Sequence, residues 1–186
     1  MFEFYNRHAF CGQCAQPTRV AKGGHELACL DQTDCKASWF PRSDPVVIML
    51  VVDPVQDACL LGRQSRWPDG LHSCLAGFME HGEAAEEAVA REVAEESSVG
   101  VTQARYHSSQ PWPFPYSLML GFVAKATSTA IQVDPLELES ARWFTREQVQ
   151  QMLSTDYDGC KLPPKGTIAH ELCQAFASND PVTQYD

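Results

Sequence analysis

The 186-residue sequence lacks any apolar run of about 18 residues, the length needed for a membrane-spanning helix. It also lacks the apolar segment of a signal peptide at its start, because residues 1–10 include the polar residues Glu3, Arg7 and His8. Without either feature, we expect a cytoplasmic protein with no membrane partner. In a reducing compartment, cysteines serve as metal ligands or buried thiols rather than disulfides.

Basic residues are also scarce. The chain has 14 Lys and Arg against 24 Asp and Glu, giving a formal net charge of −10. It has no Lys/Arg run of the kind that generic polyanion binders carry, so any affinity for an anionic substrate must come from a local site. The acidic surplus argues against tight binding to long RNA and otherwise aids solubility.

Four of the eight cysteines lie within the first 35 residues. Cys11 and Cys14 have the spacing of a zinc knuckle, and Cys29 and Cys35 form a second, wider pair. A segment this short needs a staple such as structural Zn²⁺, because it cannot bury a large core. Three alternatives stay open: His25 replaces one thiolate, the module has lost its metal, or Cys29 or Cys35 is simply buried. We expect the other cysteines to be small buried apolar residues: Cys59, Cys74, Cys160 and Cys173.

Periodicity divides the chain into a module at residues 1–40 and a domain at residues 41–186. Strands outnumber helices in the second part and one helix lies among them, which predicts an α+β fold built as a sandwich. We predict strands over residues 46–52, 58–61, 71–78, 99–108, 117–126, 131–133 and 141–144. We predict helices over residues 83–97, 145–153 and 166–177, with Thr145 as an N-cap.

The helix at residues 83–97 carries Glu92, Glu95 and Glu96. Helical residues three and four apart share one face, so these carboxylates repel each other unless a divalent cation neutralises them. Oxygen ligands favour Mg²⁺ or Mn²⁺, which can activate a bound water while a further Glu acts as general base. We expect Arg91 to pair with Glu83. The alternative is a plain acidic helix face exposed to water.

The whole segment over residues 77–99, GFMEHGEAAEEAVAREVAEESSV, resembles the Nudix box, Gly-x5-Glu-x7-Arg-Glu-U-x-Glu-Glu-x-Gly-U, where U is a bulky aliphatic residue. Ser98 replaces the second glycine, which ends the helix in a left-handed conformation. The resemblance implies the Nudix α/β/α sandwich with a mixed sheet. It also implies metal binding by Glu92 and Glu96, and ligand and base roles for Glu95 and Glu96. The matching positions are Gly77, Glu83, Arg91, Glu92, Val93, Glu95, Glu96 and Val99.

The segment SQPWPFPYS, residues 109–117, resembles the SQPWPFPxS signature of the NADH pyrophosphatase branch of this family. Its prolines stiffen the backbone and its aromatic rings suit a base or nicotinamide, although such a turn can also pack on the core. The resemblance runs from Phe10 to about Ala177. It implies two further metal ligands, the Ala76 carbonyl and Glu137. It also implies these substrate-binding residues: Phe40, in place of a Tyr, with Phe78, Gln110, Pro111, Trp112, Pro113, Phe114, Pro115, Tyr116, Ser117 and Ala169.

The resemblance implies hydrolysis of NADH and NAD⁺ to nicotinamide mononucleotide and AMP, and removal of NAD caps from RNA 5′ ends. It also implies a homodimer and a further domain before the ribbon, which we expect to be missing here. A broader diphosphatase acting on ADP-ribose or related dinucleotides is one alternative. A catalytically inactive nucleotide-binding module is another, and turnover with Mg²⁺ separates it from both enzymes.

Overall fold

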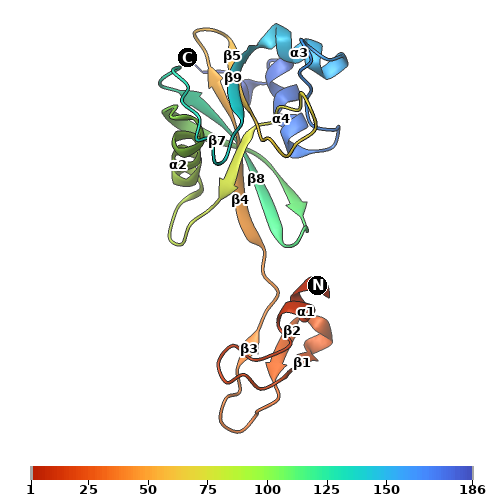
Figure 1. Ribbon diagram of the computed structural model, residues 1–186. Coiled ribbons are helices and arrows are strands. Elements are labelled where there is room, and N and C mark those ends of the chain that lie inside the picture. Colours follow the sequence, from red (N-terminus) through yellow and green to blue (C-terminus); the bar gives the residue numbers. More distant parts are fainter. Residues whose placement is uncertain (1, 186) are drawn as a thin grey trace. The chain divides into compact units, whose positions relative to one another are not determined.

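The computed structural model describes residues 2–185 and divides by contacts into two compact units. The first unit is Met1–Ser43 with Phe114–Tyr116, and the second is Asp44–Pro113 with Ser117–Asp186 (Figure 1). Within the described residues, no helix is long and apolar enough to cross a membrane.

The first unit holds a small antiparallel sheet in the order β1-β2-β3, formed by Thr18–Ala21, Glu26–Cys29 and Ser38–Trp39. A short helix, α1 (Phe2–Arg7), precedes it, and the 3-10 turn η1 (Lys22–Gly24) joins β1 to β2. The sequence predicts none of these elements, because each is too short to show a period. The buried apolar residues described here are few, so packing alone stabilises this unit weakly: Phe4, Cys11, Leu27, Ala28 and Cys29.

The second unit is built on a six-stranded mixed sheet in the order β7-β8-β4-β5-β9, with β6 paired to β4. Strands β4 and β8 are parallel, while the other pairs are antiparallel. The run of apolar residues from Val46 to Val52 is buried throughout, as expected for a central strand covered on both faces. The strands are β4 (Asp44–Asp53), β5 (Ala58–Arg63), β6 (Leu75–Phe78), β7 (Val101–Trp112), β8 (Ser117–Ala126) and β9 (Ser140–Thr145).

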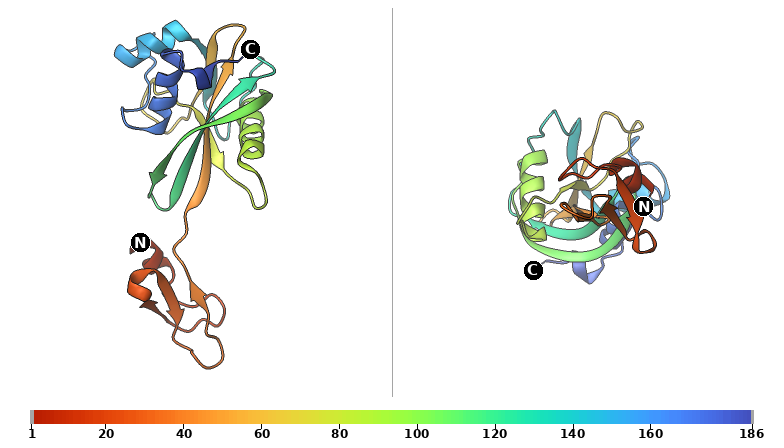
Figure 2. Two further views of the ribbon diagram at one scale, coloured as in Figure 1. Left: turned by 180° about the vertical axis from the view of Figure 1, so that it is seen from behind. Right: turned by 90° about the horizontal axis from the view of Figure 1, so that it is seen from below.

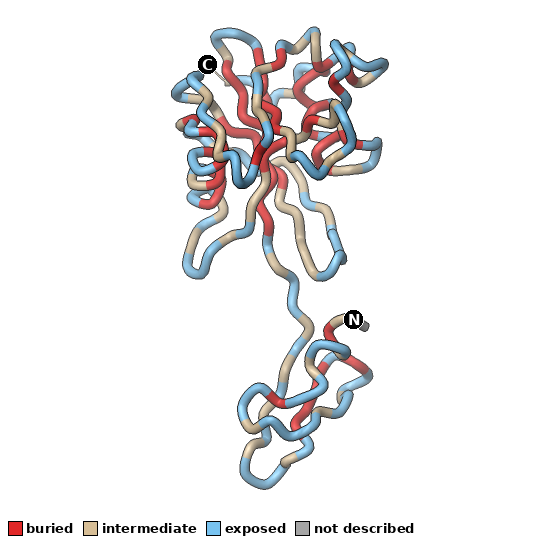
Figure 3. The backbone as a smooth tube through the Cα atoms, viewed as in Figure 1, coloured by how far each residue is buried: buried red, intermediate tan, exposed pale blue. Residues whose placement is uncertain are grey.

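Helices cover both faces of this sheet. Helix α2 (Ala85–Ser97) lies on one face, and α3 (Arg146–Ser154) and α4 (Ile168–Ala177) lie on the other (Figure 2). Two apolar cores result, one containing Val89 and Val93 of α2 and the other Leu172 and Phe176 of α4. Buried residues follow the central strands and the inner faces of the helices in Figure 3. The predicted α/β/α sandwich with a mixed sheet is therefore confirmed.

The two later helices begin where capping residues allow. Thr145 caps α3 by accepting a hydrogen bond from the Gln148 backbone N–H, which confirms the predicted N-cap. Helix α4 begins two residues after Gly166, whose φ of 84° is not helical. Thr167 is its cap.

Two strand predictions are corrected by backbone pairing. The strand predicted over residues 71–78 begins only at Leu75, because Leu71 and Ser73 form isolated bridges. The strand predicted over residues 131–133 is wrong. The Gln132 N–H donates to the Ser97 carbonyl at the end of α2, while Ile131 and Val133 pack on the core beside that helix. The four cysteines predicted to be buried small residues are all at most 5% exposed: Cys59, Cys74, Cys160 and Cys173.

Candidate active site

Three carboxylates from two separate segments meet at one end of helix α2. Glu92 and Glu96 lie one turn apart on its inner face and are 8% and 3% exposed. Glu137 is exposed on a turn following β8, where its N–H and that of Leu138 donate to the Asp134 carbonyl. One carboxylate oxygen from each glutamate lies within 4.8 Å of the others. This is the geometry of a candidate divalent-cation site.

Crowding makes the metal-free cluster electrostatically unfavourable. Burial, with Glu137 and Glu92 nearby, raises the pKa of Glu96 to about 8. Burial also raises the pKa of Glu92. Among the described residues, Oε2 of Glu96 is a buried oxygen without a hydrogen-bond partner. Such an atom needs a compensating partner, and a cation supplies one.

Glu95 does not join this cluster, although the sequence predicts three carboxylates on one face. Its side chain is exposed and accepts a 3.0 Å hydrogen bond from Nη1 of Arg91. The two helical members of the cluster are Glu92 and Glu96, which are four positions apart. The third member is Glu137.

Arg91 organises the start of the helix. It donates to Glu83, as the sequence predicts, and also to Glu92, Glu95 and the Phe78 carbonyl. The guanidinium holds the pKa of Glu83 down to about 2. The loop before α2 is thereby fixed to the helix face that carries the carboxylates.

The backbone explains the residue type at two positions of the motif over residues 77–99. A Cβ on Gly77 would overlap the carboxylate of Glu92, so only glycine leaves that side chain in place. Ser98 ends α2 with φ 60° and ψ 12°, the left-handed conformation expected of the glycine that it replaces. The substitution therefore keeps the helix end.

Two cavities in the second unit share four lining residues: Gln64, Arg66, Ala76 and Glu96. One, of about 450 Å³, has a largely apolar wall that includes Trp67, Trp112 and Ile168. The other, of about 550 Å³, contains all three clustered glutamates, with Phe78 and Arg91. An apolar chamber thus adjoins the carboxylate cluster.

The structure distributes the predicted substrate residues unevenly. Gln110, Trp112 and Ala169 line the apolar cavity, and Phe78 lines the carboxylate cavity, where it is 60% exposed. Gln110 is fixed by its own amide, which donates to the Gly166 carbonyl at 2.7 Å and accepts from the Ile168 N–H at 2.9 Å. The other predicted substrate residues line neither cavity. Pro111, Pro113 and Ser117 belong to the second unit, whereas Phe40 and Phe114–Tyr116 belong to the first.

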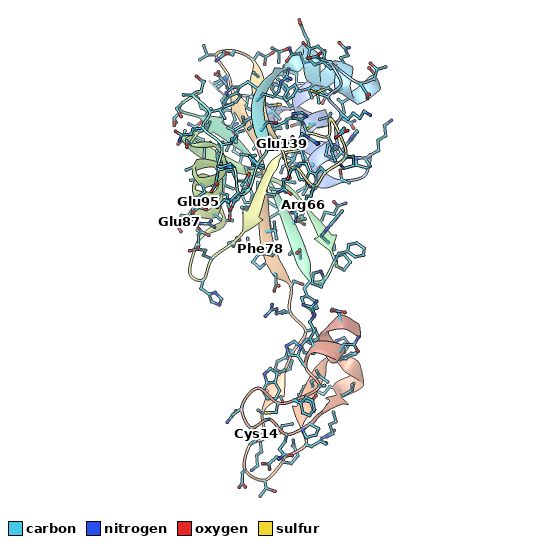
Figure 4. All side chains as sticks on the ribbon, viewed as in Figure 1. Cys14, Arg66, Phe78, Glu87, Glu95 and Glu139 are labelled. Carbon is cyan, nitrogen blue, oxygen red and sulfur yellow. The ribbon has the colours of Figure 1, made fainter. Side chains whose placement is uncertain are left out.

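Gln64, Arg66 and Trp67 are among the cavity residues that the sequence did not predict. They lie on the loop between β5 and β6, where no periodicity or family motif in the sequence marks them. Figure 4 labels Arg66 together with Phe78 and Glu95, and in that view Arg66 and Glu95 lie on opposite sides of strand β6.

The four amino-terminal cysteines form a second cluster, with one sulfur from each within 4.8 Å of the others. The Sγ–Sγ distances are 3.6 Å for Cys11–Cys35 and 3.5 Å for Cys14–Cys29. These approach the edge of about 3.8 Å in a tetrahedron with Zn–S bonds of about 2.3 Å. His25 is exposed and outside the cluster, so the wider second pair needs no substitute ligand.

The sulfurs also have donors suited to thiolates. Although burial opposes it, the N–H groups of Cys14 and Gln13 lower the pKa of Cys11 to about 7. Burial raises the pKa of Cys29 to about 12 without a metal. The donor set and its geometry fit a structural zinc.

Comparison with known families agrees with both clusters. Residues 42–160 match the NUDIX domain, and residues 6–40 match the NADH pyrophosphatase zinc ribbon domain. The fold is that of a Nudix hydrolase. The chain belongs to the Nudix family, in the branch whose members carry this zinc ribbon.

Similar proteins support that placement. The NAD-capped RNA hydrolase NUDT12 of Macaca fascicularis is 46% identical over 185 residues, covering 96% of this chain and 40% of the relative. The NAD-capped RNA hydrolase NudC of Salmonella heidelberg is 40% identical over 172 residues, covering 92% of this chain and 61% of the relative. The chain therefore spans only part of the length of these relatives.

A crystal structure of a NUDIX hydrolase from Nitrosomonas europaea superposes with a TM-score of 0.68 at 19% identity. The match covers 92% of this chain and 91% of the other. At this identity the likeness concerns the fold alone.

Proposed function

We propose that the chain hydrolyses the diphosphate of NADH and NAD⁺, giving nicotinamide mononucleotide and AMP, and removes NAD caps from RNA 5′ ends. The observation that carries the proposal is the junction of the carboxylate cluster with the apolar cavity at Ala76 and Glu96. A dinucleotide has the same two parts, a charged diphosphate flanked by flat aromatic groups. The similar proteins are named NAD-capped RNA hydrolases, and the matched ribbon is named for NADH pyrophosphatase, which supports these substrates.

The cluster fits Mg²⁺ or Mn²⁺. Glu92, Glu96 and Glu137 offer hard oxygen ligands within 4.8 Å of one another, and a cation would give the unpartnered buried oxygen of Glu96 a partner. The Ala76 carbonyl is proposed as a further ligand. A bound divalent ion would neutralise the diphosphate and lower the pKa of a water ligand.

The protein side chains around the cluster accept the proton from water and position the nucleotide during hydrolysis. Water oxygen bonds to phosphorus, the bridging P–O bond breaks, and its electron pair stays on the departing nucleotide. Glu95 or Glu96 accepts the proton from water. Trp112 and Phe78 offer flat faces to the nucleotide rings, and Gln110 is held in place by its bonds to the start of α4.

Other substrate contacts are proposed from the family resemblance. The small side chain of Ala169 leaves room in the apolar cavity. The remaining members of the proposed set are Phe40, Pro111, Pro113, Phe114, Pro115, Tyr116 and Ser117.

The proposal extends to assembly. The ribbon, residues 1–40, would hold one structural Zn²⁺, and residues 41–186 would form the Nudix domain. A homodimer follows from the family resemblance and is measurable by sedimentation. A cytoplasmic location suits the thiols. All eight cysteines are free, and the four in the ribbon must be reduced to bind zinc.

The test is AMP release from NADH, NAD⁺ and ADP-ribose with Mg²⁺ or Mn²⁺, comparing the parent with Glu96→Gln. Glu86→Gln is the matched control, because Glu86 is an exposed glutamate on the same helix. We expect release from NADH that falls at least 100-fold in Glu96→Gln and is unchanged in the control, as for loss of a group that acts on the transition state.

The other outcomes identify the alternatives. Equal or faster release from ADP-ribose would indicate a broader dinucleotide diphosphatase. No release from any substrate, combined with tight nucleotide binding, would indicate an inactive binding module and overturn the proposal.

A further inference from the structure

The loop between β5 and β6 forms a wall common to both cavities. Four residues line both the apolar cavity and the carboxylate cavity. Gln64 and Arg66 come from this loop, and the other two are Ala76 and Glu96. Any substrate that spans the two cavities must pass these four residues. Arg66 is the cation among them.

Arg66 is also available for a ligand. Two cationic residues line the cavities, Arg66 and Arg91. Arg91 is engaged by three carboxylates and the Phe78 carbonyl. Arg66 is exposed and has one hydrogen bond in the structure, from Nε to Oε1 of Gln64 at 2.8 Å. A guanidinium has five N–H donors, so its terminal nitrogens remain free to bind an anion.

The loop that carries Arg66 is held in a defined conformation. Arg63 donates to the carbonyls of Pro68 at 2.5 Å and Trp67 at 3.4 Å, and its Nε pairs with Glu139 at 2.8 Å. The Trp67 N–H donates to the Gln64 carbonyl at 3.0 Å. The backbone on both sides of Arg66 is therefore held by contacts within the protein, which lowers the entropic cost of using its side chain.

From this arrangement we infer that Arg66 binds the diphosphate on the side facing the apolar cavity, opposite the carboxylate cluster. The inference rests on the proposed function. A guanidinium matches two oxygens of one phosphate with paired hydrogen bonds, which an ammonium cannot do. Arg66 transfers no proton and forms no covalent bond.

The contact strengthens as the reaction proceeds. When the bridging P–O bond breaks, negative charge grows on the oxygens of the departing phosphate. A fixed guanidinium beside those oxygens stabilises them more in the transition state than in the bound substrate. Arg66 therefore acts on kcat as well as on KM.

The experiment compares the full chain with Arg66→Gln and Arg66→Lys, using Arg19→Gln as the control. Arg19 is an exposed arginine of β1 that lines neither cavity, so Arg19→Gln removes the same charge away from the cavities. Two quantities are measured: kcat and KM for NADH with Mg²⁺, and the affinity for inorganic pyrophosphate with Ca²⁺ by calorimetry. Unfolding temperatures check that each variant is folded.

We expect Arg66→Gln to lower kcat/KM and pyrophosphate affinity by roughly 10- to 100-fold, the range for a hydrogen bond to a charged group. Part of the loss in kcat/KM should be in kcat. Arg66→Lys should recover part of the affinity and less of kcat, while Arg19→Gln matches the parent.

The two measurements separate this inference from the proposed function. If the parent hydrolyses NADH and Arg66→Gln behaves like Arg19→Gln in both assays, Arg66 is a solvated surface arginine and the inference is overturned. If the parent has no turnover but loses pyrophosphate affinity in Arg66→Gln alone, the contact stands and the proposed function fails. If the parent neither turns over nor binds pyrophosphate, both are overturned.

Discussion

Arg91 and Glu83, eight residues apart, form a two-point ion pair with Nε–Oε1 at 2.7 Å and Nη2–Oε2 at 2.9 Å. Glu83 also accepts the Glu80 N–H at 2.9 Å. The pair therefore fixes the backbone turn before α2 to the helix itself. Because Arg91 donates to Glu92 as well, the same contact positions one of the clustered carboxylates.

Breaking that pair should alter the response of the protein to acid. The guanidinium of Arg91 lowers the pKa of Glu83 from 4.5 to about 2, so the pair contributes stability above pH 4.5 that is lost as pH falls towards 2. Glu83→Gln should be less stable than the parent at pH 6, and the difference should shrink below pH 4. Urea unfolding at several pH values measures it, with exposed Glu86→Gln as the control. A difference independent of pH would contradict the assigned role.

The carboxylate cluster should destabilise the metal-free protein at alkaline pH. Burial raises the folded pKa of Glu96 from 4.5 to about 8, so the contribution of Glu96 to stability is most favourable below pH 4.5 and falls as pH rises through 8. Metal-free Glu96→Gln should therefore exceed the parent in stability at pH 8.5, by on the order of 1 kcal/mol or more. Urea unfolding without and with Mg²⁺ measures this. A less stable variant under metal-free conditions would refute the argument.

Addition of Mg²⁺ should remove that difference between parent and variant. A cation bound to the folded state alone stabilises it by mass action, and the parent offers the better site. The unfolding midpoint of the parent should rise with Mg²⁺ concentration, while that of Glu96→Gln should rise less.

Zinc should be bound by the ribbon and not by the buried thiols of the second unit. Cys29→Ser removes a fully buried member of the four-sulfur cluster, whereas Cys160→Ser changes a buried cysteine outside it. We expect one Zn²⁺ per chain in the parent and in Cys160→Ser, and loss of zinc in Cys29→Ser. Metal analysis after dialysis measures the content. Retention of a full zinc equivalent by Cys29→Ser would show that the cluster is not the site.

Ser98 offers a stabilising substitution. Its φ of 60° is strained for a residue with a Cβ and free for glycine, so Ser98→Gly should raise the free energy of unfolding by about 0.5–1 kcal/mol. Thr155 also ends a helix, but its φ of −150° is not left-handed. Thr155→Gly should therefore give no gain. Equal effects of the two glycines on urea unfolding would remove the conformational explanation.

The sequence predicts those parts of the site that local spacing determines. Glu92 and Glu96 lie four residues apart in a strongly helical segment, so their common face follows from the helix period alone. Glu95 shares much of that spacing, yet its position depends on Arg91, which draws the carboxylate to the exposed side. A hydrogen bond between two particular side chains does not follow from helix periodicity, so the sequence pattern does not predict it.

Tertiary pairing determines the rest. Ile131 and Val133 have strand-like composition, but the neighbouring Gln132 finds its backbone partner at the end of a helix. Arg66 lies in a loop whose conformation depends on contacts that Arg63 makes with the Trp67 carbonyl and with Glu139, which is distant in sequence. Only the folded chain shows that this loop separates two cavities.

The position of Glu137 has a consequence for how the site arises during folding. Two members of the carboxylate cluster come from one helix, but the third follows the β7–β8 hairpin, about 40 residues later. The Asp134 N–H anchors this turn to the Glu96 carbonyl at 3.2 Å, so the turn is placed only after the hairpin has docked. A peptide containing the whole glutamate-rich motif would thus hold cations weakly. Cation affinity reports on completed tertiary structure, and an insertion in the later turn could abolish it while leaving every residue of the motif intact.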